Sequence, residues 1–191
     1  MKKLRLIAGL GNPEERYERT LHNAGFWFAD AVVRKFGGQF RYEKKFDADV
    51  CKVDIAGDDV WVIKPQSYMN ESGGPVRSAM DYYRIQINDV LVAHDEIDLP
   101  PGTVRFKDGG GHGGHNGLRD IIRHAGRDFV RLRVGVGHPG DKNKVTGYVL
   151  RPVSNATADP IERTVDDAVA ELPTLVEDGL NAAMKALHTK G

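Results

Sequence analysis

The chain has 191 residues, 27 basic and 27 acidic side chains, and a formal net charge of zero at pH 7. This length suits one domain with a sizeable core, and the charge balance argues against indiscriminate coating of nucleic acid. The lone Cys51 excludes an internal disulfide, and the short apolar run of residues 6–10 fits neither a signal peptide nor a membrane span. We therefore expect a cytoplasmic protein with no membrane partner.

The first half of the chain predicts alternating strands and helices. Residues 4–10 predict a buried strand, and an apolar stripe from Ala24 to Val32 has helical spacing. Residues 50–55 and 60–63 predict two strands that are close enough to pair as a hairpin through a turn at residues 57–59. Pro75 fits a first helical position, which predicts a helix from there to Tyr83, and residues 90–93 predict another strand.

The second half continues the alternation. Residues 103–107 form a short polar strand pattern, and residues 131–136 alternate charged and apolar side chains as in a half-exposed strand. The tail from Asp159 carries two apolar helical stripes, which Pro173 kinks or breaks. Interspersed strands and helices predict an α/β fold, a single three-layer domain over residues 1–191 with a mixed, mostly parallel sheet flanked by helices.

A glycine-rich loop, residues 109–117, carries His112, His115 and Asn116 and leads directly into a helical pattern. We expect Asn116 to be the N-cap, and the free N–H groups of the helix start favour an anionic or carbonyl-bearing ligand. The loop satisfies G-x-G-x-x-G, but the preceding strand is short and polar and no acidic residue follows at the dinucleotide-binding distance. A phosphate-binding G-x-x-x-x-G-K-[ST] sequence is absent from the chain.

Polar side chains follow three of the predicted strands. Asn12, Asn70 and Asp95 each come after a strand, and ligands of open α/β sheets bind at the carboxyl ends of strands. His22 and Asn116 lie at helix starts that can face the same edge. The sequence has no G-x-S-x-G, and Cys51 lies in an alternating strand pattern that predicts a buried thiol, so a covalent acyl-enzyme is not expected. Histidine, aspartate and amides instead suit a water molecule activated by an imidazole.

At these residues the chain closely resembles the bacterial peptidyl-tRNA hydrolases, over nearly its whole length. The matching segments, in chain order, are residues 9–13 (GLGNP), Tyr17, residues 22–25 (HNAG), residues 64–65 (KP), residues 68–73 (YMNESG), residues 92–102 (VAHDEIDLPPG), the glycine-rich loop and residues 135–140 (GVGHPG). The resemblance implies an α/β monomer without metal or cofactor that hydrolyses the ester between a peptide and tRNA and releases free tRNA.

The resemblance also implies roles for individual residues. His22 accepts a proton from water, Asp95 keeps His22 in its basic form, and Asn12 helps to distinguish blocked from free aminoacyl groups. Asn70 and Asn116 bind substrate, and the residues that line the cleft are Tyr17, Tyr68 and Met69. Leu21 and the pair Ser67-Tyr68 depart from the family's usual Arg and Thr-Phe, which concerns tRNA contact at the cleft rim and the packing of that wall.

The neutral total charge hides a basic middle. Residues 105–151 carry ten Lys and Arg against four Asp and Glu, whereas residues 154–191 carry three against seven. A local basic surface favours a polyanionic partner, although the same charges also fit solvated faces of unrelated elements. Residues that resemble the tRNA-facing cluster of the family are Arg105, Lys107, Arg133, Lys142 and Lys144.

Two other classes of function remain open at this point. A non-catalytic RNA-binding module explains the basic middle but not the grouping of His22, Asp95 and three asparagines. A metal-dependent hydrolase with His112, His115 and Asp95 as ligands has to assemble its site from scattered residues, since the chain lacks H-E-x-x-H and C-x-x-C.

Overall fold

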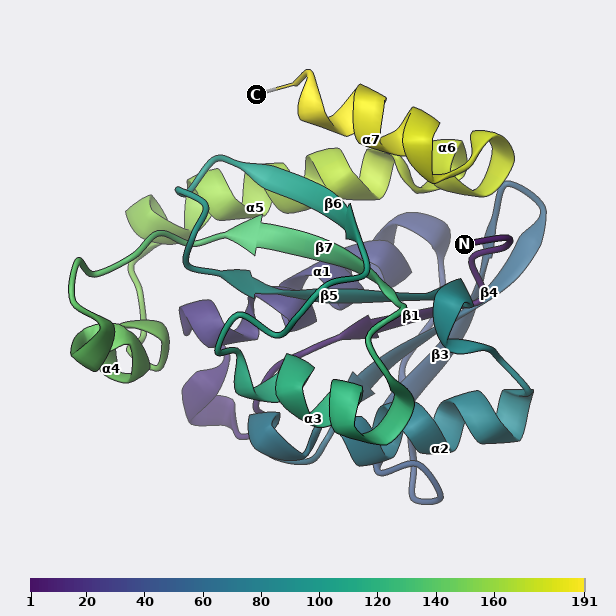
Figure 1. The fold of residues 1–191 in the computed structure, drawn as a ribbon, viewed down its shortest axis with the longest axis horizontal. Coiled ribbons are helices and arrows are strands. Elements are labelled where there is room, and N and C mark those ends of the chain that lie inside the picture. The colour runs from purple at the N-terminus through teal and green to yellow at the C-terminus, as the bar shows by residue number, and fades with distance from the viewer. Residues whose placement is uncertain (191) are drawn as a thin grey trace.

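A seven-stranded mixed sheet forms the centre of the computed structural model, which describes residues 1–190 (Figure 1). The spatial order is β2-β3-β4-β1-β5-β7-β6. The four central strands β4, β1, β5 and β7 are parallel, and antiparallel strands extend the sheet at both edges. The strands are β1 (Leu6–Gly9), β2 (Arg41–Glu43), β3 (Ala48–Ile55), β4 (Asp58–Pro65), β5 (Val90–Glu96), β6 (Val104–Asp108) and β7 (Val130–Gly135).

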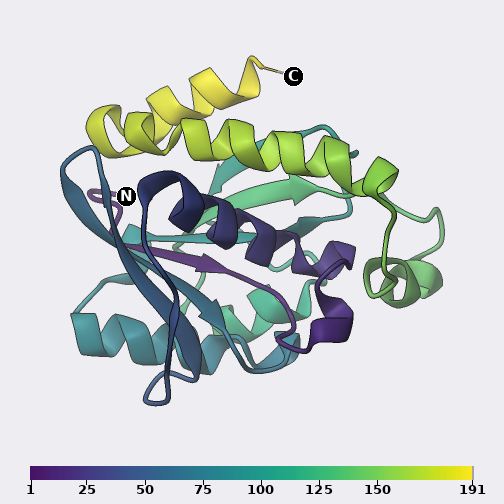
Figure 2. The same cartoon turned by 180° about the vertical axis from the view of Figure 1, so that it is seen from behind.

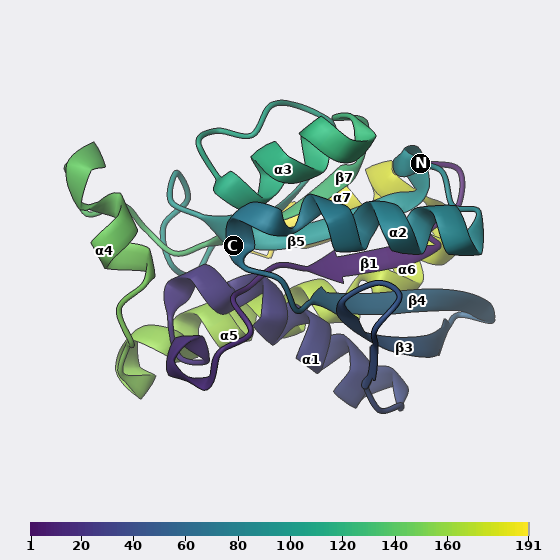
Figure 3. The ribbon, with the colours of Figure 1, turned by 90° about the horizontal axis from the view of Figure 1, so that it is seen from below.

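Helices cover both faces of the sheet, which makes the expected three layers of a single α/β domain (Figures 2 and 3). One face is covered by α1 (Ala24–Phe36), α5 (Asn155–Ala170), α6 (Leu172–Asp178) and α7 (Leu180–His188). The other face is covered by α2 (Gly73–Tyr83) and α3 (Asn116–Ala125). The short helix α4 (Val145–Val149) stands apart from these layers, at the left of Figure 1. Among residues 1–190, no helix has both the length and the apolar character needed to cross a membrane.

Successive side chains of the central strands point to opposite faces of the sheet and so contribute to two separate hydrophobic cores. Ile7 of β1 packs into the core shared with α1 and α5, whereas its neighbours Leu6 and Ala8 pack into the core beneath α2 and α3. Because both faces are covered, the central strands are apolar on both sides. Polar groups are therefore concentrated at the strand ends, where the sheet meets the loops.

Most elements agree with the expectations from the sequence, and the differences have local causes. The hairpin of β3 and β4 is confirmed, although its turn lies at Ala56-Gly57 and β4 already begins at Asp58. Helix α2 begins at Gly73 rather than at Pro75, because the Gly73 N–H donates to the carboxylate of Asp120 on α3 (2.7 Å).

The C-terminal helices show both a confirmed and a corrected boundary. The break expected at Pro173 is confirmed, since α5 ends at Ala170 and Pro173 is in the first turn of α6. Helix α5 begins at Asn155, before the expected start at Asp159, and the Ser154 hydroxyl accepts a hydrogen bond from its first turn. Strand β7 is not half-exposed as predicted, because its charged residue Arg131 is buried.

Candidate active site

Close packing of α1 against the central strands places His22 at the carboxyl edge of the sheet. A Cβ at Gly25 in the first turn of α1 would lie 2.4 Å from the carbonyl oxygen of Ala93 on β5. Only glycine permits this approach of helix to strand. The single-turn helix η2 (Leu21–Asn23), directly before α1, is thereby held over the end of β5, where Asp95 lies.

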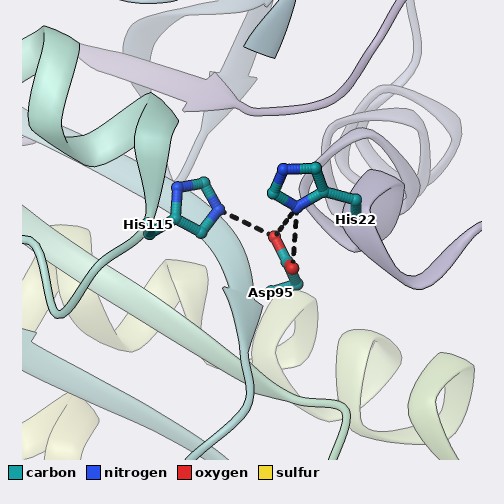
Figure 4. A group of neighbouring side chains, drawn as sticks. All are labelled: His22, Asp95 and His115. Atoms are coloured by element: carbon teal, nitrogen blue, oxygen red, sulfur yellow. Dashed lines mark hydrogen bonds and ion pairs between the residues drawn. The ribbon is translucent and has the colours of Figure 1, made fainter. Parts of the chain in front are cut away.

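Asp95 accepts hydrogen bonds from two histidines that come from different segments (Figure 4). The Nδ1 of His22 lies 2.8 Å from Oδ2 and 3.0 Å from Oδ1 of Asp95. The Nε2 of His115, at the end of the glycine-rich loop, lies 2.8 Å from the same Oδ1. The Asp95 side chain is 3% exposed, against 13% for His22 and 9% for His115. The carboxylate is therefore almost completely shielded from water.

The mutual contacts shift the titration of both His22 and Asp95. Burial alone lowers the pKa of the His22 imidazole, but the charge and hydrogen bond of Asp95 outweigh it and raise that pKa above its ordinary value. Burial alone raises the pKa of Asp95, whereas the two histidines hold it far below its ordinary range. Asp95 is therefore a carboxylate at any physiological pH, and it strengthens the basicity of His22.

His115, not Asn116, is the N-cap of α3, which corrects the expectation from the sequence. The His115 Nδ1 accepts hydrogen bonds from the backbone N–H groups of Gly117 (3.1 Å) and Leu118 (3.3 Å). Because backbone N–H groups can only donate, the neutral His115 ring carries its proton on Nε2 and donates it to Asp95. His22 likewise donates its Nδ1 proton to Asp95, so its Nε2 is left as the basic nitrogen.

Asn12 is locked into the backbone at the end of β1. Its Oδ1 accepts a hydrogen bond from the Met69 N–H (2.8 Å), and its own backbone is bound on both sides by the Asn23 side chain. The Met69 side chain in turn packs against α3, where a Cβ at Gly117 would lie 2.7 Å from its sulfur. These contacts tie the segments that carry Asn12 and Asn70 to the helix start that carries His115.

The remaining predicted substrate residues surround this framework without entering the His-Asp-His group. Asn70 is exposed on the single-turn helix η3 (Met69–Glu71), and the exposed Asn116 accepts a hydrogen bond from Arg119 (3.3 Å). Tyr68 is 54% exposed, and Tyr17 is partly buried on a neighbouring segment. Glu14 raises the pKa of the Tyr68 hydroxyl, which places Tyr68 beside the segment of Tyr17.

At two of the positions that depart from the family pattern, the side chain supports the fold. Leu21 is 1% exposed and belongs to the core beneath α1. The Ser67 hydroxyl donates to the Glu71 carbonyl (2.9 Å) and so closes the turn of η3. Only Tyr68 places a large exposed side chain at this rim.

A cavity of about 360 Å³ opens beside the His-Asp-His group. One wall is formed by the glycine-rich loop and the end of β5, and the opposite wall by α4 and the turn η5 (Lys142–Lys144). The cavity is lined by His22, His94, Asp95, Glu96, Ile97, His112, Gly113, Gly114, His115, Asn116, Lys142, Val145, Thr146, Val149 and Leu150. The structure thus brings the expected pair His22 and Asp95 together with Asn116 and Lys142 around one hollow.

The predicted basic residues Arg105, Lys107 and Arg133 share one face of the strands β6 and β7. Arg105 and Arg133 are directly opposite each other in this antiparallel pair, which brings like charges together. Glu96 relieves this repulsion, since its Oε1 lies 2.9 Å from the Nε of Arg133. Lys107 is exposed, and Lys142 lines the cavity from η5. The strand face and the cavity meet at Glu96.

The structure does not bring together the three residues that the sequence offers as metal ligands. His112 does not join His115 and Asp95, because its Nδ1 accepts from the Gly114 N–H (2.9 Å). In the described part of the chain, the ligand atoms that lie within 4.8 Å of one another belong to His22, Asp95 and His115. These atoms already bind each other at 2.8 Å, which is closer than two ligands of one ion stand.

His115 has contacts that the sequence does not predict. The sequence places it in the glycine-rich loop, as one of two imidazoles beside a helix start and as a candidate metal ligand, whereas it is the helix cap and the second donor to Asp95. A histidine directly before Asn-Gly at a helix start was the available signal, but short polar residues are the usual N-caps.

Comparison with known proteins shows the family of this chain. Residues 6–191 match the family described as peptidyl-tRNA hydrolase. The chain belongs to the peptidyl-tRNA hydrolase family. A family member from Halorhodospira halophila is 51% identical over 185 residues, which cover 96% of this chain and 95% of that protein. A peptidyl-tRNA hydrolase from Stenotrophomonas maltophilia is 48% identical over 190 residues and covers 99% of each chain.

A solved structure of the family has the same fold. The crystal structure of peptidyl-tRNA hydrolase from Acinetobacter baumannii superposes with a TM-score of 0.95 at 42% identity, covering 98% of this chain and 96% of that one. The family resemblance and the enzyme class expected from the sequence are therefore confirmed, and so is the α/β fold with its mixed sheet.

Proposed function

We propose that this protein hydrolyses the ester bond between tRNA and a peptide or N-blocked aminoacyl group, using a water molecule activated by His22. Family membership supports the reaction and the release of free tRNA for reuse in translation. The observation that supports the mechanism is the orientation of His22, whose Nδ1 is bound to the buried Asp95 while its Nε2 is left as a base.

In the proposed mechanism, the Nε2 of His22 takes a proton from water as the water oxygen attacks the ester carbonyl. Asp95 stabilises the resulting imidazolium, and it stays ionised because His115 also donates to it. When the tetrahedral intermediate collapses, His22 returns the proton to the ribose oxygen that leaves with the tRNA. No covalent acyl-enzyme forms on this route.

The asparagines bind the substrate around this centre in our proposal. Asn12 is the most constrained, because Met69 occupies its Oδ1 and leaves its NH2 group to donate to a substrate carbonyl. Such a fixed donor helps to distinguish a blocked from a free aminoacyl group. Asn70 and Asn116 bind substrate polar groups, and the residues that contact the peptide side of the cleft are Tyr17, Tyr68 and Met69.

The basic residues bind the tRNA body through its phosphates in this proposal. Arg105, Lys107 and Arg133 on β6 and β7, together with Lys142, form the docking surface. We further propose that residues 1–191 act as a single-domain monomer in the cytoplasm, without metal or cofactor. The buried free Cys51 is consistent with a reducing compartment.

The decisive test is incubation of the pure protein with N-blocked aminoacyl-tRNA in the presence of EDTA. We expect hydrolysis without added metal, and loss of activity in EDTA that zinc restores would overturn the metal-free mechanism. The variant His22→Ala should abolish turnover but retain tRNA affinity, because the imidazole acts on water and contributes little to ground-state binding. Equal loss of affinity and rate would contradict the role of His22, and binding without turnover by the wild type would indicate an RNA-binding module.

A further inference from the structure

Arg131 on β7 is a buried cation that the proposed reaction does not use. It is only 2% exposed and is the largest fully buried side chain of the described residues. Within residues 1–190, no carboxylate lies within ion-pair distance of its guanidinium, although salt bridges to other arginines are present. A buried charge without an opposite charge is costly unless fixed dipoles compensate it.

Backbone carbonyl groups compensate the two terminal nitrogens of the guanidinium, whereas its buried Nε has no hydrogen-bond partner among the described residues. The guanidinium donates to the carbonyl oxygens of Gly110 (2.5 Å), Gly111 and Arg127 (3.2 Å). Its Cζ also lies over the Phe129 ring, 4.2 Å from the ring centroid. Burial lowers the pKa of Arg131 to about 10, which leaves the group charged at neutral pH. Charged donors make stronger hydrogen bonds to carbonyl groups than neutral donors do.

Two of these three carbonyls belong to the glycine-rich loop, and that part of the loop has few other attachments. The Gly109 N–H donates to the Phe129 carbonyl (3.0 Å), and both Gly109 and Gly110 have positive φ angles. Glycines at such angles lose more conformational entropy on ordering than other residues do. The hydrogen bonds to the carbonyl groups of Gly110 and Gly111 in the described part of the chain come from Arg131.

The far end of the same loop delivers the second donor to Asp95. His115 follows Gly111 by four positions, and the short path between them is braced by the bond from the His115 N–H to the His112 carbonyl (2.9 Å). A displaced loop would therefore carry the His115 ring away from Asp95, and Asn116 with it. Arg131 and His115 hold the two ends of one segment.

We propose that Arg131 is a positioning residue for catalysis, whose guanidinium fixes the glycine-rich loop so that His115 stays bound to Asp95. This inference rests on the proposed function of the His-Asp-His group. The planar fork of arginine reaches three carbonyls at once, which the single ammonium of a lysine at this position does not. Because Arg131 is buried, it acts through the loop and does not contact the tRNA.

The first measurement needs no activity. Amide hydrogen exchange of Gly117 and Leu118 reports whether the His115 cap is in place, since both N–H groups donate to its Nδ1. In Arg131→Met and in Arg131→Lys, we expect these amides to exchange at least about tenfold faster, while the amides of β1 keep their protection. The control is Arg127→Gln, which removes an exposed arginine beside the loop and leaves the Arg127 carbonyl in place. In this control variant, the amides of Gly117 and Leu118 should exchange at the wild-type rate.

The second measurement is kinetic, with full N-blocked aminoacyl-tRNA and with a short N-blocked aminoacyl fragment. A displacement of the order of 1 Å at a reacting group costs about 100-fold in rate, so we expect kcat to fall about 10- to 100-fold on both substrates in both Arg131 variants. KM and its salt dependence should change less than about twofold, because no phosphate contact is lost. The acid limb of the pH profile of kcat/KM should move to higher pH, since Asp95 then binds His22 alone.

Each other outcome contradicts the proposal. Wild-type exchange and rate in Arg131→Lys would mean that the charge alone matters, and a raised KM with a flatter salt dependence would mean a phosphate contact. Loss of protection throughout the sheet in both variants would make Arg131 a residue of the general core. Failure of the proposed function is separately visible as absence of turnover in the wild type, whereas the exchange result tests the loop by itself.

Discussion

Asp95 accepts hydrogen bonds from two imidazoles that differ in the partners of their second nitrogen. The Nδ1 of His115 accepts the two backbone N–H groups that cap α3. The Nε2 of His22 has no such partner among the described residues. In the proposed mechanism, His22 is therefore the base and His115 the fixed donor.

This division of roles predicts the behaviour of Asp95→Asn at the residue scale. A neutral amide accepts only through its single oxygen and cannot stabilise the His22 imidazolium by charge. We expect kcat to fall by about 100- to 10,000-fold, as for the same exchange in other carboxylate-histidine pairs. Because Asp95 raises the pKa of His22, its loss should move the acid limb of the pH-rate profile to lower pH.

The matched control for that measurement is Asp98→Asn, which alters an exposed carboxylate three positions along the chain. Its rate and pH profile should equal those of the wild type. If Asp95→Asn also keeps the wild-type rate and profile, the pairing of Asp95 with His22 has no catalytic role. Stability of both variants is compared by thermal unfolding at neutral pH.

At the scale of elements, the antiparallel pair β6-β7 presents Arg105, Lys107 and Arg133 on one face. Lys107 is exposed and makes no ion pair within residues 1–190, whereas Arg133 is bound to Glu96. Removing Lys107 therefore tests phosphate binding without breaking an ion pair, although the end of its side chain lies beside Gly110. Removing Arg133 also unpairs Glu96, a residue that lines the cavity.

We expect Lys107→Gln to raise KM for the full tRNA substrate and to reduce the slope of log KM against log salt by about one, because one phosphate contact is lost. Turnover of a short N-blocked aminoacyl fragment should not change. Lys52→Gln is the control, since Lys52 is an exposed residue of β3 that is paired with Asp59. If Lys107→Gln impairs the fragment and the full tRNA equally, Lys107 supports the fold and the docking surface lies elsewhere.

Periodicity and strand ends allowed much of this arrangement to be predicted, and the exceptions share one physical cause. The approach of His22 to Asp95 was expected from their places at a helix start and a strand end, and the structure brings them together. The alternation around Arg131 predicted an exposed side chain, because sequence patterns do not reveal carbonyl groups of a distant loop. His115 was misplaced for the same reason, since its partners are backbone N–H groups and a carboxylate twenty positions away.

At the scale of the whole molecule, the site imposes a cost on the folded state at mildly acidic pH through His94. This histidine is 2% exposed beneath the glycine-rich loop, and its Nδ1 donates to the Asp95 carbonyl (2.9 Å). Burial, followed by the neighbouring His115, lowers the pKa of His94 from 6.5 to about 4. Between pH 6.5 and pH 4, His94 binds a proton in the unfolded chain but not in the folded protein. The free energy of unfolding therefore falls as the pH falls.

The other titratable groups of the site change the stability of the protein outside this pH range. The pKa of His22 is raised, so its contribution is complete below pH 6.5 and is lost only as the pH rises above that value. Asp95 and Glu96 have lowered pKa values, and their contributions are lost only below the ordinary carboxylate range near pH 4. The interval from pH 6.5 to pH 5 therefore isolates His94 among these residues.

The variant His94→Asn removes the titrating ring, and its amide N–H can still donate to the Asp95 carbonyl. It should be less stable than the wild type at pH 7, where the smaller side chain leaves a cavity. Between pH 7 and pH 5, the free energy of unfolding should fall by about 2 kcal/mol more in the wild type than in the variant, since one pH unit corresponds to about 1.4 kcal/mol. Urea unfolding of the wild type and of His94→Asn at half-unit steps of pH measures this difference. If the two curves of unfolding free energy against pH run parallel, the folded protein accepts the proton on His94 as readily as the unfolded chain does.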